Sequence, residues 1–198
     1  ESRHTQAVEA LDAVLKEEPN NFEALEKLTD ALAGQRSARL LETAEHLLAL
    51  DAQNAKGLYH LATIRLYQGR ADEAIQLAKR SLGRDPGNIR ARNLLAIAYG
   101  QTFQPALSEA EFQRAIAQAP EDSTSYNNYG IFLLERNKIA EARRQFGRAI
   151  SVNPEDVQGF VGMGETFRNE GDLRKAGDWY RKALRLDPNQ PVAKQYVK

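Results

Sequence analysis

Apolar and small residues recur along this chain with the spacing of one face of a helix, in short runs that turn residues separate. In residues 55–88 a first run is interrupted at Gly69, and a second run stops at Asp85-Pro86. The first run contains Leu58, Leu61, Ala62 and Leu66, and the second contains Ala74, Ile75, Ala78 and Leu82. Each run predicts a helix, so the segment is expected to form helix, turn, helix, turn.

The turn that ends this segment recurs with a fixed period. Pro86, Pro120, Pro154 and Pro188 are 34 residues apart, and Pro19 lies 67 residues before Pro86, so that Ala52 stands about where a further proline is expected. Proline disfavours helical geometry at the residue before it, and each proline therefore predicts the end of a helix. The residues expected to cap the helices that follow are Asn88, Asp122 and Asp156. A period of this size indicates a stacked repeat protein, and it shifts the expected function from catalysis toward binding another protein.

Small and large side chains alternate in register between the repeats. Small residues recur at Ala62, Ala96, Gly130 and Gly164, at Ala7, Ala74, Ser108, Ala142 and Ala176, and at Ser81, Ala115, Ala149 and Ala183. The large residues expected to fill the space between paired helices are Phe112, Tyr126, Tyr129, Phe146, Phe160, Phe167 and Tyr180.

In the spacing of these small and large residues, the chain resembles the tetratricopeptide repeat (TPR) family. The signature positions are Tyr126, Tyr129-Gly130, Leu133, Ala142, Phe146, Ala149 and Pro154 in one repeat, and Phe160, Met163-Gly164, Phe167, Gly171, Ala176, Tyr180, Ala183 and Pro188 in the next. The resemblance implies an all-α fold, a right-handed superhelix (α-solenoid) of antiparallel helix pairs whose first helices line a concave groove.

The repeats predict one solenoid domain over residues 1–198. Its full repeats are expected at 22–54, 55–88, 89–122, 123–156 and 157–190, after a half repeat at 1–21 and before the start of a further or capping helix at 191–198. Because a half repeat cannot bury its own apolar face, we expect a piece of a longer protein or an end that pairs with another chain.

Some positions depart from the repeat pattern. Leu40 and Leu47 replace small residues, and Ala44 and Ala78 replace aromatic ones, which indicates compensating volume. The further departures are Arg65 and Arg92, which replace large apolar residues. Each arginine must reach solvent or an acidic partner, and two interpretations remain open: surface arginines with buried stems, or a binding spot.

The resemblance also implies which residues face the groove. The predicted partner-binding residues are Tyr59, His60, Thr63, Arg90, Asn93, Leu94, Ile97, Asn127, Asn128, Ile131, Val161 and Glu165. Aliphatic side chains beside amides suit an extended segment or an amphipathic helix of a partner. The alternative is that the aliphatic residues pack against the neighbouring repeat.

A narrower resemblance concerns residues 101–135. There a Gln-Thr pair and a later proline precede a second helix, and Asn-Asn-Tyr-Gly lies in the next repeat. This stretch is similar to the type IV pilus pilotin lipoproteins, a family that helps to assemble the outer-membrane secretin.

Composition narrows the function classes. The chain has no cysteine, which excludes disulfides and thiolate chemistry, and its net charge of 0 argues against a general nucleic-acid binder. Residues 1–51 carry 5 basic and 11 acidic residues, whereas residues 52–198 carry 22 and 16. This polarity allows partner steering or self-association, although ordinary surface variation also explains it. No apolar run is long enough to cross a bilayer, so direct membrane insertion is not expected. The composition does not choose between a cytoplasmic and a periplasmic location.

Catalytic motifs are not evident. Glu1 and His4 have the spacing of a helical iron ligand pair, but one such pair at a chain end carries little weight. We therefore predict a non-catalytic scaffold that uses no cofactor or metal and binds a protein or peptide in the groove. Two alternatives remain: a recruiting segment of a larger enzyme or of a secretion or pilus assembly machine, and a scaffold that self-associates through its open ends.

Overall fold

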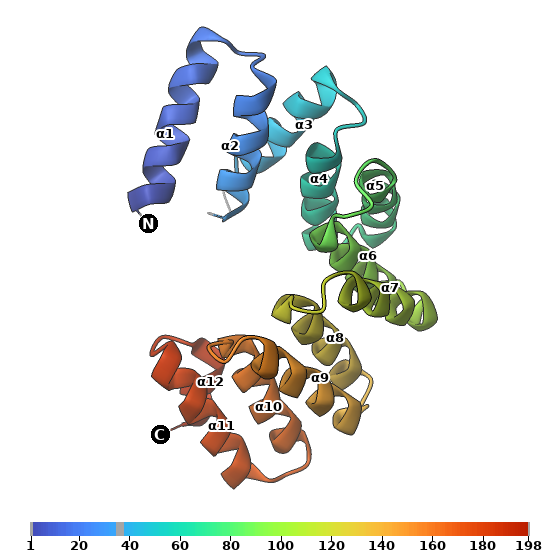
Figure 1. Ribbon diagram of the computed structural model, residues 1–198, viewed down its shortest axis with the longest axis vertical. Coiled ribbons are helices and arrows are strands. Elements are labelled where there is room, and N and C mark those ends of the chain that lie inside the picture. Colours follow the sequence, from blue (N-terminus) through green and yellow to red (C-terminus); the bar gives the residue numbers. More distant parts are fainter. Residues whose placement is uncertain (1, 35–37, 198) are drawn as a thin grey trace. The chain divides into compact units, whose positions relative to one another are not determined.

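The structure is a computed structural model that describes residues 2–34 and 38–197, and all regular structure in these ranges is helical (Figure 1). The helices are α1 (Ser2–Glu17), α2 (Phe22–Gly34), α3 (Leu40–Leu50), α4 (Ala55–Tyr67), α5 (Ala71–Arg84), α6 (Ile89–Gln101), α7 (Pro105–Gln118), α8 (Ser123–Glu135), α9 (Ile139–Val152), α10 (Val157–Asn169), α11 (Leu173–Leu186) and α12 (Pro191–Tyr196). The all-α expectation is confirmed.

Local sequence signals set the helix ends. The side chains of Asn88, Asp122 and Asp156 each accept a hydrogen bond from the backbone N–H three residues later, which confirms them as N-caps. Asn54 and Gln190 act in the same way at α4 and α12. A cap of this kind satisfies one of the donors that the first turn of a helix leaves without a partner.

The turn inside each repeat has its own period. Gly69, Phe103, Asn137 and Gly171 all have positive φ angles, of 75°, 56°, 59° and 81°. These residues are 34 positions apart, so one backbone geometry recurs in four turns. Glycine and asparagine tolerate the left-handed region, whereas the phenylalanine adopts it against its intrinsic preference.

The chain divides into two compact units, Glu1–Gln104 and Pro105–Lys198. The boundary falls inside the predicted repeat 89–122, whose first helix α6 belongs to the first unit and whose second helix α7 belongs to the second. That all the repeats act as one solenoid domain stays a prediction.

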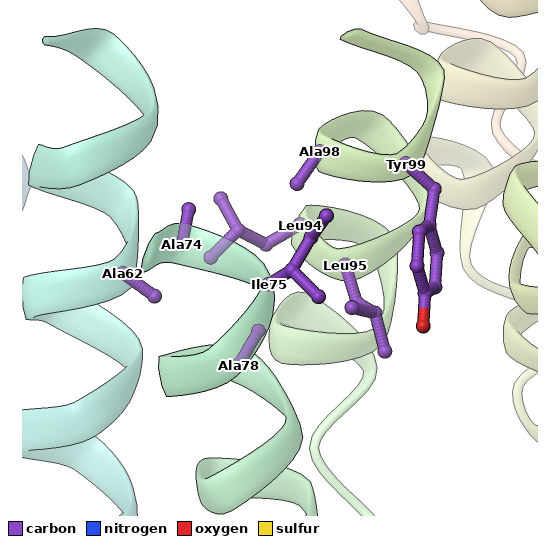
Figure 2. Close-up of a cluster of buried hydrophobic side chains, with 8 residues drawn as sticks. All are labelled: Ala62, Ala74, Ile75, Ala78, Leu94, Leu95, Ala98 and Tyr99. Atoms are coloured by element: carbon purple, nitrogen blue, oxygen red, sulfur yellow. The ribbon is translucent and has the colours of Figure 1, made fainter. Parts of the chain in front are cut away.

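In the first unit, small residues allow the helices to approach closely. Figure 2 shows Leu94 and Ala98 of α6 among Ala74 and Ile75 of α5, with Ala62 of α4 nearby. Ala62 and Ala74 are fully buried, as expected of the small positions. A second cluster joins Leu28 and Leu32 of α2 to Leu40 of α3. Leu40, which departs from the repeat pattern, is therefore part of the core.

In the second unit, aromatic rings take the place of these aliphatic contacts. Phe146 of α9 is fully buried and lies against Gly130 of α8 and Gly162 of α10. The ring of Tyr180 on α11 lies against Gly164 of α10 in the same way. A bare backbone at these glycines leaves room for a ring, which explains why the small and large positions alternate along the sequence.

Candidate partner-binding faces

The predicted groove residues of the first unit lie on α4 and α6, and most of them are engaged within the unit. His60 is 2% exposed, and its Nε2 lies 3.0 Å from Oδ1 of Asp30 on α2. Tyr59 and Thr63 are half-buried, and the Tyr59 ring lies 4.9 Å from that of His60. Arg90 is exposed. His60 therefore ties this side of α4 to α2.

Charged groups complete this contact between α2 and α4. Lys56 Nζ lies 3.1 Å from Oδ2 of Asp30 and 3.7 Å from Oε2 of Glu26. The other carboxylate oxygen of Glu26 accepts a hydrogen bond of 2.7 Å from Asn54 Nδ2. The hydrogen bond from His60, together with the hydrogen bond and the charge of Lys56, lowers the pKa of Asp30 to about 2, against the opposing effect of burial. This network holds adjacent repeats together, and its carboxylates are already paired.

On α6, two of the four predicted residues are buried. Leu94 is 8% exposed and belongs to the cluster shown in Figure 2. Asn93 is also buried, and Ile97 is half-buried. For Leu94, packing against a neighbouring helix accounts for the side chain, as the alternative interpretation expected.

In the second unit, Asn127 of α8 is likewise part of the scaffold. It is 5% exposed, and its Nδ2 donates to both carboxylate oxygens of Asp156, at 2.8 and 3.0 Å. Asp156 is also the N-cap of α10. In the first unit, Glu26 at the equivalent repeat position accepts a hydrogen bond from the cap residue Asn54. The fifth residue of these repeats therefore bonds to the cap of the next first helix.

The remaining residues of the second unit differ in exposure. Val161 is 4% exposed and packs with Tyr180 of α11. Glu165 is half-buried, and its two oxygens accept hydrogen bonds from Tyr180 Oη at 2.6 Å and from Arg168 Nε and Nη2. Ile131 remains 37% exposed, and Asn128 is half-buried.

Two further residues of α8 and α10 are neutral and exposed. They are Thr124 on α8 and Gln158 on α10. Within the second unit, the predicted face is therefore uncharged apart from Glu165, whose charge Arg168 compensates at 2.6 Å. The sequence predicted Asn128, Ile131 and Glu165 as groove residues, but it did not separate them from the buried Asn127 and Val161. The pairing of position five with the next cap was missed, although polar residues at both positions were a signal for it.

The two arginines that depart from the pattern are held by local contacts. Arg65 is 17% exposed at its side chain and lies 3.7 Å from a carboxylate of Glu45 and 3.6 Å from one of Glu73. Arg92 donates to the carbonyl oxygen of Pro86 at 2.9 Å. These contacts account for both side chains without a bound partner.

Nothing in the described part of the chain provides a metal site or a membrane span. Residues 2–34 and 38–197 contain no group of three or more potential metal ligands. None of their helices combines the length and the apolar character that a bilayer crossing requires. The side chains of Glu1 and His4 lie outside the described part of the molecule.

The arrangement of helix pairs agrees with sequence profiles of a known family. A tetratricopeptide repeat profile matches residues 35–89 and 132–191, which is more than half of the chain, and a second one matches residues 65–128. The chain belongs to the tetratricopeptide repeat family. Family and fold together support a protein-interaction scaffold.

One curated relative is a pilus protein. The chain is 28% identical over 128 residues to the type IV pilus assembly protein PilF of Pseudomonas aeruginosa, which covers 64% of the chain and 51% of PilF. The match thus spans about half the length of that relative. The weaker similarity expected from residues 101–135 is confirmed, because this relative is a type IV pilus protein.

Solved structures of type IV pilus proteins and of a TPR protein have a similar fold. The structure of Pseudomonas aeruginosa PilF superposes with a TM-score of 0.63 and 25% identity, covering 72% of each chain. PilW, a type IV pilus biogenesis factor, gives a TM-score of 0.80 at 15% identity, covering 97% of this chain and 90% of PilW. YrrB, described as a TPR protein with an unusual peptide-binding site, gives 0.58 at 21% identity over 95% and 97%. The likeness to PilW and YrrB shows the fold alone.

Proposed function

We propose that this chain is a non-catalytic scaffold that binds an apolar, uncharged segment of a partner protein on the α8–α10 face. The observation that carries the proposal is the exposure of Ile131 among neutral polar side chains. An aliphatic side chain flanked by amides suits a peptide that presents apolar side chains and backbone hydrogen-bonding groups.

The contrast with the first unit supports this choice of face. On α2 and α4 the charged groups bond to one another, as in the Asp30–Lys56 and Glu23–Lys27 pairs. A partner would have to compete with these bonds for each carboxylate, whereas binding at Ile131 breaks no ion pair. We therefore expect the first unit to contribute less to affinity than the second.

The similarity to PilF favours a role in a pilus or secretion assembly machine. The supporting observation is the 28% identity to PilF over 128 residues. In this interpretation the chain recruits a component of the machine through its repeats.

The test compares two substitutions of exposed aliphatic residues in one unit. Ile131→Asp changes the proposed face, and Leu173→Asp changes the first residue of α11, which is 69% exposed. Partners are captured from the source cell with the wild-type chain and identified by mass spectrometry. The affinity of the purified partner is then measured by calorimetry for all three proteins.

We expect Ile131→Asp to weaken binding at least about tenfold, because an aspartate would have to be desolvated at the contact. Leu173→Asp should leave the affinity unchanged. Equal affinity for Ile131→Asp and wild type, with both folded by circular dichroism, would exclude the α8–α10 face. Leu94→Asp is unsuitable for this purpose because Leu94 is a core residue.

A further inference from the structure

The first unit carries two charge clusters of equal size and opposite sign. Residues 9–23 contain five acidic residues and one basic residue, whereas residues 79–92 contain five basic residues and one acidic residue. The acidic cluster consists of Glu9, Asp12, Glu17, Glu18 and Glu23, and the basic cluster of Lys79, Arg80, Arg84, Arg90 and Arg92. In each cluster four of these side chains are exposed and one is half-buried.

Both clusters surround equivalent turns. Pro19 lies in the turn from α1 to α2, and Pro86 lies in the turn from α5 to α6. In a stack of like repeats, the turns that follow the second helices lie along one edge, with the α3–α4 turn between these two. A hydrogen bond of 2.7 Å from Arg80 Nη2 to the carbonyl oxygen of Ala52 joins the basic cluster to that middle turn.

The basic cluster has little internal compensation. In the described part of the chain, no carboxylate lies within ion-pair distance of Lys79, Arg84 or Arg90. Like charges at close range repel one another, so an acidic partner surface would relieve this repulsion.

The acidic cluster offers both charge and apolar surface. Val14 of α1 is 42% exposed and Phe22 of α2 is 37% exposed, on either side of Glu17 and Glu18. Of the acidic residues, Asp12 pairs with Arg39 and Glu23 pairs with Lys27, which leaves the turn itself negative. Apolar side chains ringed by charge are typical of the surfaces on which proteins associate.

We infer that two copies of this chain associate along this edge, with the acidic turn of each copy against the basic turn of the other. Because both clusters belong to one unit and lie at the two ends of one edge, a two-fold axis near the middle turn brings them together twice. The result is a closed dimer. This surface consists of residues of the first unit, whereas the α8–α10 face consists of residues of the second, so the inference does not depend on the proposed function.

The experiment measures the mass of the full chain by analytical ultracentrifugation at two salt concentrations. We expect a concentration-dependent dimer at low salt and an association constant at least about tenfold lower at about 1 M salt, where the screening length falls to about 3 Å. A monomer at every concentration in low salt would overturn the inference. So would a dimer that salt does not weaken, or a mass that grows without limit.

Charge exchange then tests which surfaces meet. Arg84→Glu/Arg90→Glu and Glu17→Lys/Glu18→Lys should each be monomeric alone, and an equimolar mixture of the two variants should form a dimer again. Arg144→Glu/Arg148→Glu in α9 is the matched control, since both arginines are exposed helix residues of the other unit, and it should associate like wild type. Failure of the mixture to associate, with both variants folded, would overturn the pairing of these turns.

Discussion

A single methyl group at Gly162 is expected to destabilise the second unit. A Cβ placed there would lie 2.3 Å from two ring atoms of Phe146, far inside the contact distance of about 3.5–4.0 Å for carbon atoms. The ring has little room to retreat toward α8, because it already lies so close to the backbone of Gly130 that a Cβ there would be 2.7 Å from it. Phe146 is thus fixed between two helices that approach closely only because each has a glycine there.

The magnitude follows from two opposing effects. Inserting a methyl group into a filled core costs about 1–3 kcal/mol, and the confined ring places this case toward the upper end. Replacing glycine by alanine inside a helix stabilises by about 1 kcal/mol. We therefore expect Gly162→Ala to lower the free energy of unfolding by about 1–2 kcal/mol, which raises the unfolding equilibrium constant about 5–30-fold.

Urea denaturation measures this loss, with the fluorescence of Trp179 as the probe. Trp179 is the only tryptophan, and it lies in α11 of the same unit, with its ring centroid 5.9 Å from that of Phe160. Gly147→Ala in α9 is the control, because nothing lies within 4 Å of a Cβ there. It should stabilise the unit by about 1 kcal/mol through helix propensity alone.

A double-mutant cycle with Phe146→Leu tests the cause. The smaller side chain should cost less in the Gly162→Ala background than in wild type, with a coupling of about 0.5–3 kcal/mol. If Gly162→Ala is as stable as Gly147→Ala, or if the two substitutions at positions 146 and 162 are additive, the ring is not confined as described.

Further outcomes follow from other sites. Asp156→Ala should cost about 2–4 kcal/mol, because it removes a helix cap and also leaves a buried amide donor of α8 without an acceptor. Asp172→Ala removes a cap and a partly exposed ion pair with Lys175, which contributes little, and should cost about 1 kcal/mol. Equal losses in urea denaturation would contradict the second role of Asp156. Phe103→Gly should stabilise the protein by about 0.5–1 kcal/mol and raise its melting temperature, because glycine adopts a φ of 56° without strain and the ring, which is 90% exposed, contributes little packing. A lower melting temperature would refute this. The folded pKa of Asp30 is about 2, below the ordinary 3.8, so its carboxylate stabilises the fold above pH 3.8 and loses this effect as the pH falls to about 2. The difference in unfolding free energy between wild type and Asp30→Asn, under about 1 kcal/mol for this partly exposed group, should therefore shrink over that pH range. A constant difference would argue against the ion pair.

The sequence by itself determined the repeat, the helices and their ends. These features depend on local chemistry: a proline stops a helix at the residue before it, and the side chain of Asp122 caps the turn three residues ahead. The small positions were also predictable, because the rings that fill the adjacent space recur with the same period. Family membership follows from the same pattern.

Only the tertiary structure decided which of the predicted groove residues are free. Leu94 stands at the same repeat position as Asn128, and Asn127 and Val161 stand one position earlier, yet these three are buried whereas Asn128 is half-buried. Burial at these positions depends on what a neighbouring helix presents, such as the Asp156 carboxylate opposite Asn127. A contact between residues about 30 positions apart is set by packing, which the order of residues within one repeat does not contain.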